Sequence, residues 1–171
     1  MKPLSDYIGE KLLFFQTSAF KRIHELKVND EIIATMQQKG FFGMRWETSI
    51  QNKNWEIYKP SIWKGVLEIR EKGYEMPFAS FSRERFKSRG TVSLPKGETL
   101  KIEPHLFKGY TEIKNIHDEC IVHIKPKTSL KDKAEVTIQK RSELIDKYPW
   151  VILVAYVIIL EQRQQAAHSG I

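Results

Sequence analysis

The sequence predicts a mainly β protein, a closed antiparallel barrel of about nine to twelve strands that encloses one C-terminal hydrophobic helix. Two observations lead to this fold. Between about residues 12 and 141, apolar and polar residues alternate, which is the period of strands with one buried face. From Trp150 to Leu160 the chain is apolar without interruption, and a helix that is apolar on all sides must be buried on all sides. Residues 1–171 are therefore expected to form a single domain in which the strands surround the helix.

The strands are recognised by their alternation and are separated by turn residues. In the segment 44–50, Trp46 and Ile50 fall on one side of an extended chain, whereas Arg45 and Glu47 fall on the other. The same apolar parity recurs at Trp55 and Ile57, Leu67 and Ile69, Leu100 and Ile102, and Ala134, Val136 and Ile138. Turn-forming residues stand at Asn29-Asp30, Asn52–Asn54, Lys72-Gly73, Pro95–Gly97, Lys108-Gly109 and His117-Asp118. Consecutive strands should therefore pair as antiparallel hairpins with one face toward solvent.

The helix is expected from about residue 149 to about residue 165. Ser142 is a suitable N-cap ahead of it, and Pro149 fits the first turn, where its missing N–H costs nothing. Six of the ten residues from Val151 to Leu160 are β-branched, which by itself favours a strand. Eleven consecutive apolar residues exceed the roughly 4–8 of a usual strand, so length favours the helix.

The composition is that of a globular protein with anionic partners. Hydrophobic residues make up 41% of the chain and charged residues 29%, which excludes disorder. The formal net charge of +7 favours lipid headgroups, nucleic acid or an acidic protein surface as partners, and the alternative is a basic surface that only keeps the protein soluble. Cys120 is the only cysteine, so no intramolecular disulfide can form. The apolar run is about half of the roughly 17–25 residues that span a bilayer, and no secretory leader is recognisable, so we expect a cytosolic protein without a transmembrane span.

A meander of antiparallel strands followed by one wholly apolar helix resembles the tubby C-terminal domain-like superfamily, which includes the LURP-one-related proteins and the phospholipid scramblases. The resemblance lies in Glu143–Glu161, where an acidic residue and a short polar lead-in precede the apolar helix, and in Arg22–Ala34, which is similar to the family's early strand, polar turn and strand. It implies a closed barrel around the helix, and relatives that act as phosphoinositide-binding membrane tethers or as scramblases. The scramblases' cysteine-rich acylation cluster has no counterpart here, because Cys120 stands alone.

A lipocalin-like or fatty-acid-binding-like barrel is the alternative architecture, and its interior would carry a small apolar ligand in place of the helix. A helix packed outside such a barrel would have a polar face, and residues 150–160 have none. The sequence therefore favours the filled barrel and leaves the carriage of an apolar ligand as an alternative function.

The most suggestive polar feature is the basic segment Phe81–Arg89. If the strand that begins near Phe78 continues through it, four cations lie on one side of the chain and form a row. The four are Arg83, Arg85, Lys87 and Arg89. Such a row suits anionic phospholipid headgroups or an acidic partner, and each cation contributes about 1 kcal/mol near an anionic membrane at low salt. The alternative is a solvated hairpin end in which Glu84 and Glu103 pair with some of the arginines.

Two further sets of residues bear on binding. The basic stretch Lys125–Lys133 contains Pro126, which indicates a loop or strand edge, and it would extend the row if the barrel brought the two together. Aromatic residues beside basic charge can also form a stacking groove for nucleic acid. The candidates by type are Trp55, Tyr58, Trp63 and Phe86. Because Trp55 shares the parity of core residues, nucleic acid is the less favoured partner.

The sequence predicts neither a metal site nor catalysis. On one strand His117 and His123 would lie roughly 20 Å apart, and Cys120 would have the opposite parity, so the three cannot meet at one ion. Cys120 is instead expected in the core beside Val122 and Ile124. The chain lacks a serine nucleophile elbow, a glycine-rich phosphate loop, a zincin helix and a dinucleotide fingerprint. We therefore expect a non-enzymatic, cofactor-free binding module, either in the cytosol or peripheral at a membrane.

Overall fold

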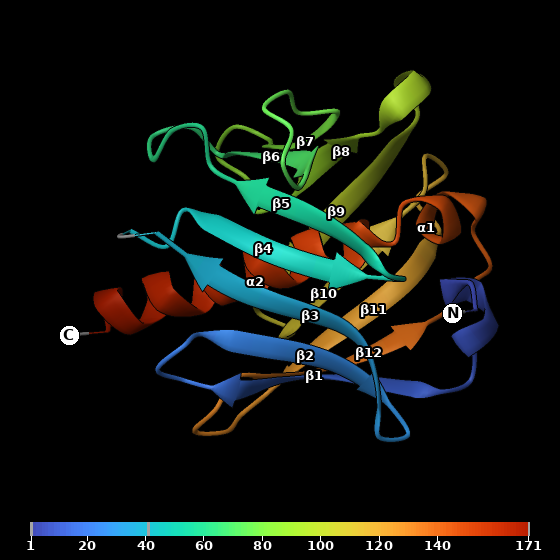
Figure 1. Cartoon of the computed structure of the whole chain (residues 1–171), viewed down its shortest axis with the longest axis horizontal. Helices are drawn as coiled ribbons and strands as arrows, with labels where there is room; N and C mark the ends of the chain where they lie inside the picture. The colour runs from blue at the N-terminus through green and yellow to red at the C-terminus, as the bar shows by residue number, and fades with distance from the viewer. Residues whose placement is uncertain (1, 41, 171) are drawn as a thin grey trace.

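The structure, a computed structural model, describes residues 2–40 and 42–170. It is a closed barrel of twelve antiparallel strands with a helix through its centre, as predicted (Figure 1). The strands are β1 (Lys11–Ser18), β2 (Ile23–Val28), β3 (Glu31–Lys39), β4 (Arg45–Ile50), β5 (Lys53–Tyr58), β6 (Val66–Glu71), β7 (Ala79–Arg83), β8 (Gly90–Ser93), β9 (Thr99–His105), β10 (Tyr110–Lys114), β11 (Cys120–Lys127) and β12 (Lys133–Ile138). The helices are α1 (Glu143–Lys147) and α2 (Trp150–Ser169), with 3-10 turns η1 (Leu4–Tyr7) and η2 (Pro95–Gly97). Each strand pairs with its neighbours in sequence, and β1 pairs with β12 to close the barrel.

The alternation in the sequence is the inside-outside alternation of the barrel wall. The apolar parities of β4, β6, β9 and β12 are buried, as predicted. Trp55 departs from the prediction because it is only partly buried, near the start of β5. Its ring packs edge-on against Phe78 at a centroid distance of 5.4 Å, at the margin of the core.

Helix α2 fills the barrel. Residues 150–160 are at most 3% exposed, and the ring of Tyr156 stacks on that of Phe14 with centroids 4.0 Å apart. The helix extends four residues beyond the predicted end, to Ser169. At the other end, α1 is a separate helix, because Tyr148 precedes a proline and has the non-helical φ of −122°. The occupied interior distinguishes this protein from a lipocalin-like barrel.

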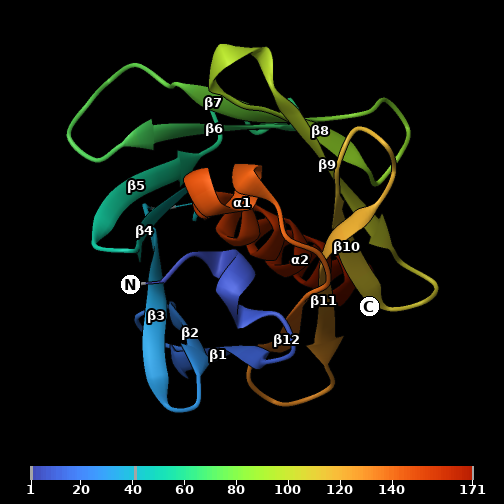
Figure 2. The ribbon, with the colours of Figure 1, turned by 90° about the vertical axis from the view of Figure 1, so that its right-hand side faces the viewer.

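The two ends of the barrel are built differently. At one end, which we call the base, η1 and α1 close the barrel beneath the start of α2 (Figure 2). The backbone N–H of Ser5 donates to Asp146 Oδ1 at 2.7 Å, and the N–H of Ser142 donates to Ser5 Oγ at 3.1 Å. At the opposite end, which we call the mouth, the last two turns of α2 emerge between the hairpin loops (Figure 1).

Cys120 does not lie in the core, so that prediction was wrong. The pairing of β10 with β11 shifts register between Ile113 and Lys114, so that Ile121 and Val122 are both buried. This bulge turns Cys120 to the outer face, where its Sγ lies near Glu112. Burial, aided by that carboxylate, raises the pKa of the Cys120 thiol to about 11, which keeps it protonated and unreactive at neutral pH.

Candidate functional site at the mouth of the barrel

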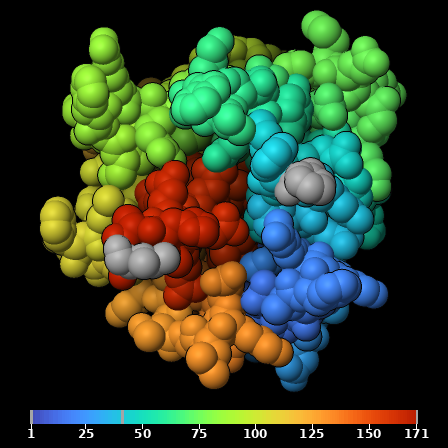
Figure 3. Space-filling model, turned by 90° about the vertical axis from the view of Figure 1, so that its left-hand side faces the viewer, coloured from blue at the N-terminus to red at the C-terminus, as the bar shows by residue number. Residues whose placement is uncertain are grey.

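Six hairpin loops form the mouth, because every connection from an odd-numbered strand to the next strand lies at this end. The loops span residues 19–22, 40–44, 59–65, 84–89, 106–109 and 128–132. Figure 3 looks into this end: α2 emerges in the centre, and the loops surround it as separate lobes. The mouth therefore brings together segments that are distributed over more than a hundred residues of sequence.

Each of these loops carries at least one exposed large apolar side chain. They are Phe20, Phe42, Ile62, Trp63, Phe86, Leu106, Phe107 and Leu130. Trp63 is 89% exposed and Phe86 93%, so these side chains contribute almost nothing to the core. Exposed single apolar residues are common on protein surfaces, but a set on six neighbouring loops around one opening indicates an interaction surface.

The same six loops are strongly basic. They contain nine Lys or Arg residues and two acidic residues. The cations are Lys21, Arg22, Lys59, Lys64, Arg85, Lys87, Arg89, Lys108 and Lys131, and the anions are Glu84 and Asp132. The mouth thus combines exposed apolar side chains with a positive field.

The predicted row of four cations does not exist as a strand face. Strand β7 ends at Arg83, and residues 84–89 form a loop in which Phe86 has the left-handed φ of 60°. Arg83 has the inward parity of Phe81, whereas Lys87 and Arg89 pair with Glu84 at 3.3 and 3.0 Å. The parity of Arg83 was readable in the sequence, because a residue two positions after a buried phenylalanine on a strand points the same way.

The cations of that row are instead divided between two parts of the mouth. Arg85, Lys87 and Arg89 belong to the loop that displays Phe86, and the Arg85 guanidinium lies 4.9 Å from the centroid of that ring. Arg83 lines a hollow beside α2. The stretch Lys125–Lys133 contains the mouth loop 128–132, which the loop 106–109 separates from the loop 84–89, and it contributes the exposed Leu130.

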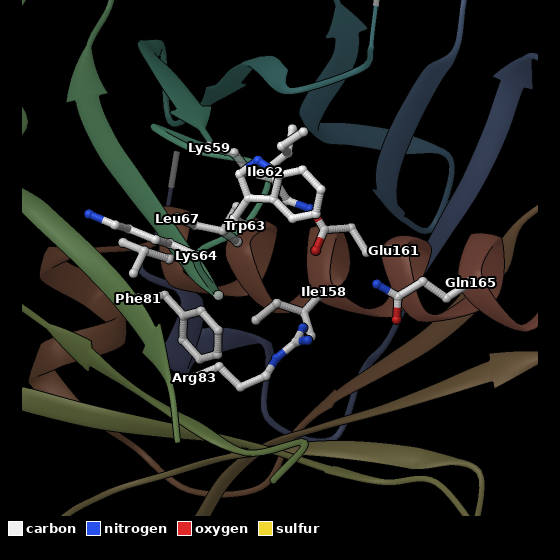
Figure 4. A pocket seen from close by; sticks show the side chains of 12 residues that line it. Lys59, Ile62, Trp63, Lys64, Leu67, Phe81, Arg83, Ile158, Glu161 and Gln165 are labelled. Atoms are coloured by element: carbon white, nitrogen blue, oxygen red, sulfur yellow. The ribbon is translucent and has the colours of Figure 1, made fainter. Parts of the chain in front are cut away.

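Three hollows surround α2 where it leaves the barrel. One of about 160 Å³ lies between α2 and the loop 59–65, and it includes Arg83 and Trp63 (Figure 4). Another, of about 290 Å³, lies against β9 and β10 and has Ile159 in its wall. A third, of about 410 Å³, lies against β1–β4 and reaches His24. Two ion pairs lie in their walls: Lys59 Nζ to Glu161 Oε1 at 2.8 Å lines the first hollow, and Arg163 Nη1 to Asp132 Oδ1 at 3.0 Å joins the linings of the other two.

His24 is a buried titratable residue in the wall of the third hollow. The residue is 2% exposed, and its Nδ1 hydrogen-bonds with the hydroxyl of Tyr156 at 3.1 Å. Burial lowers the pKa of His24 to about 4, because the imidazolium form would lose its hydration, and nearby Asp132 offsets this only in part. Burial also raises the pKa of Tyr156. The pair is therefore neutral at physiological pH and supports the packing of α2.

Neither a metal site nor a membrane-spanning helix is found among the described residues. No group of three or more of their His, Cys, Asp or Glu side chains is arranged to hold a metal ion. In the same residues, no helix has the length and apolar character needed to cross a bilayer.

Fold and mouth together define a helix-filled, twelve-stranded antiparallel barrel with one apolar and basic end. No family model and no curated protein matches the chain. Among solved structures, an Arabidopsis thaliana protein determined by X-ray crystallography is similar, with a TM-score of 0.60 and 9% sequence identity over 92% of this chain and 93% of that one. At this identity the likeness shows a shared fold and nothing about a shared ligand.

Proposed function

We propose that this protein is a non-enzymatic module that docks mouth-first on anionic membrane surfaces. One observation supports the proposal above all others: the same six loops carry both the exposed apolar side chains and the excess of cations. Stable membrane association generally needs two such signals acting together, since either one alone binds weakly. The contact surface is thus the ring of loop tips, and it includes Arg85, Lys87 and Arg89 from the predicted set.

The apolar part of the surface suits the membrane interface. Trp63, Phe86 and Phe107 are large, exposed and carried on loops that are free to enter the headgroup layer. Aromatic side chains are enriched at this depth of a bilayer, where an apolar ring contacts the upper acyl chains. Each apolar side chain that leaves water there stabilises the bound state.

The electrostatic part directs the protein to anionic lipid. A cation near an anionic membrane contributes about 1 kcal/mol, and the contribution falls as salt screens it. Among the described residues, ion pairs occupy Lys59, Lys87 and Arg89, and no ion pair occupies the remaining six loop cations. The cytoplasmic leaflet is the anionic one in cells, so the proposal places the protein in the cytosol, peripheral at the membrane. Membership of the tubby-like superfamily is a further prediction consistent with this role.

The test is co-sedimentation with vesicles of phosphatidylserine and phosphatidylcholine, beside vesicles of phosphatidylcholine alone. One variant removes apolar side chains from the mouth, and its matched control removes them from the base. The mouth variant is Phe20→Ser, Trp63→Ser, Phe86→Ser and Phe107→Ser, and the base variant is Tyr74→Ser, Met76→Ser and Ile116→Ser. We expect the mouth variant to bind anionic vesicles at least about tenfold more weakly and the base variant to bind as the natural protein does.

Binding should also weaken as salt is raised to about 0.5 M, because the Debye length shrinks. If the two variants bound anionic vesicles equally well, the mouth would not be the surface that contacts the membrane. Failure of the natural protein to bind any vesicle at low salt would sink the membrane proposal, and would direct the search to an acidic protein or to nucleic acid as the partner of the basic loops.

A further inference from the structure

Arg83 occupies an unusual place in the barrel wall. It is the last residue of β7 and shares the inward parity of Ala79 and Phe81, so its side chain enters the mouth from the inner face of the wall. Figure 4 shows it reaching toward Ile158 of α2, across the hollow from Trp63, while Lys64 is directed away. A guanidinium is therefore held inside a small cavity at the end that we propose to face the membrane.

The guanidinium of Arg83 has no carboxylate partner among the described residues. Its Nε is buried and makes no hydrogen bond, and no ion pair involves its side chain. Partly buried cations elsewhere in the mouth are paired, as Lys59 is with Glu161 and Arg163 with Asp132. A guanidinium without a counter-ion in a restricted space favours a ligand that brings oxygen acceptors to its terminal N–H groups.

The surrounding chain makes room for this side chain. The N–H of Arg83 donates to the carbonyl of Gly65 at 2.8 Å, and a Cβ on Gly65 would lie only 3.1 Å from Arg83 Cβ. The absence of a side chain at position 65 thus lets the Arg83 side chain lie against the backbone of Gly65, just before β6. Apolar walls from Leu67, Phe81 and Ile158 limit the access of water to the guanidinium.

We propose that the Arg83 hollow binds the phosphate of one lipid headgroup, a site that rests on the proposed membrane docking. Guanidinium groups hold phosphate through two parallel charge-assisted hydrogen bonds, and these strengthen where water is restricted. The one carboxylate that lines the hollow, that of Glu161, is neutralised by Lys59. At about 160 Å³ the hollow takes a phosphate group but not a whole lipid, so the glycerol and the acyl chains leave past Trp63 toward the bilayer.

The test uses dihexanoyl phosphatidic acid below its micellar concentration, with binding followed by titration calorimetry and by the change in total tryptophan fluorescence, to which Trp63 at the hollow contributes. Arg83→Gln removes the charge, and Lys96→Gln is the matched control because it removes one cation from the base, away from the hollow. We expect Arg83→Gln to weaken binding about tenfold to a hundredfold, Arg83→Lys to retain part of the affinity, and Lys96→Gln to change it less than about threefold. The melting temperature of Arg83→Gln should not fall, because no native partner is lost.

Each outcome has a separate meaning. Equal affinity of the natural protein and Arg83→Gln for the short-chain lipid would overturn the headgroup site, even if both still sediment with anionic vesicles. Short-chain binding that depends on Arg83, without vesicle binding, would keep the site and overturn the docking. Inorganic phosphate serves as a second ligand: if it binds as tightly as the lipid, the site is one for free phosphate and the lipid assignment is wrong.

Discussion

The mouth and the base of this barrel are made from the same kind of element, a hairpin connection, but their chemistry is opposite. The six mouth loops carry nine cations and two anions, whereas the five hairpin connections at the base carry two cations and five anions. The base residues are Lys72 and Lys96, with Asp30, Glu75, Glu98, Asp118 and Glu119. Because both ends close the same strands, the difference is not required by the fold, and it points to a function at one end.

Turn geometry supports the same conclusion. Two base connections consist of just two residues, Asn29-Asp30 and Gln51-Asn52, and all four residues have left-handed φ values between 45° and 69°. Such tight turns match the twist of paired strands and present little side chain. No mouth loop is shorter than four residues, and each one displays an apolar side chain. The other three base connections have five to seven residues, and two of them carry exposed apolar side chains, namely Tyr74, Met76 and Ile116. The contrast is therefore that all six mouth loops present apolar side chains, whereas only two of the five base connections do.

The largest effect should come from the helix that links the two ends. Ile158→Asp would place a carboxylate where the helix is fully buried, at a cost comparable to a whole free energy of unfolding of about 5–15 kcal/mol. We expect no folded protein by circular dichroism and size exclusion. Gln165→Asp, two turns later on the exposed part of the same helix, should change stability by less than about 1 kcal/mol. A cooperatively melting Ile158→Asp protein would contradict burial of the helix on all sides.

Acid should weaken the mouth half of the core through His24. The pKa of His24 is lowered to about 4 in the folded protein, so between pH 6.5 and 4 the unfolded chain binds a proton that the folded protein does not. The free energy of unfolding should therefore fall by about 3 kcal/mol as the pH drops through this window, and His24 should have no effect above it. Urea unfolding at several pH values measures this, and the slope should flatten in His24→Gln. An unchanged slope would assign the acid sensitivity to other groups.

The charge difference between the two ends can be tested by making one mouth loop negatively charged, as the base connections are. Arg85→Glu with Lys87→Glu should weaken binding to anionic vesicles by at least about 2 kcal/mol at low salt, which is roughly thirtyfold or more, because two cations are lost and two anions are added. The matched change at the base, Lys72→Glu with Lys96→Glu, should have little effect, because those residues lie at the end of the barrel opposite the mouth. Similar losses in both proteins would mean that net charge matters and the mouth does not.

The smallest effect concerns the closure of the base. Asp146→Ala removes the acceptor of the Ser5 N–H and should destabilise the protein by about 1–2 kcal/mol, while vesicle binding stays unchanged. Thermal unfolding and co-sedimentation of the same preparation separate the two properties. A loss of vesicle affinity in this variant would couple the base to the docking surface.

Much of the fold was predictable because burial imposes a period on the chain. The alternation around Trp46, Leu67 and Leu100 predicted the inner face of the wall, and the unbroken apolar run predicted the buried helix. The site was less predictable. Arg85, Lys87 and Arg89 do lie at the proposed surface. The predicted row of cations, however, required the strand to continue to Arg89, and β7 ends at Arg83. A strand of a hairpin ends where its pairing partner ends. The partner of β7 is β8, which begins at Gly90, so the pairing stops at Arg83.

By itself, then, the amino-acid sequence determined the wall, the central helix and the excess of positive charge, because each of these is a local pattern that burial or composition imposes. Only the tertiary structure decided which way Cys120 and Arg83 face, since a bulge and a strand end change parity without changing composition. It also decided that the loops that carry Phe20, Trp63 and Phe107 surround one opening. In the sequence these residues cannot be told from core residues, because their exposure follows from the closure of the barrel and not from their neighbours in the chain.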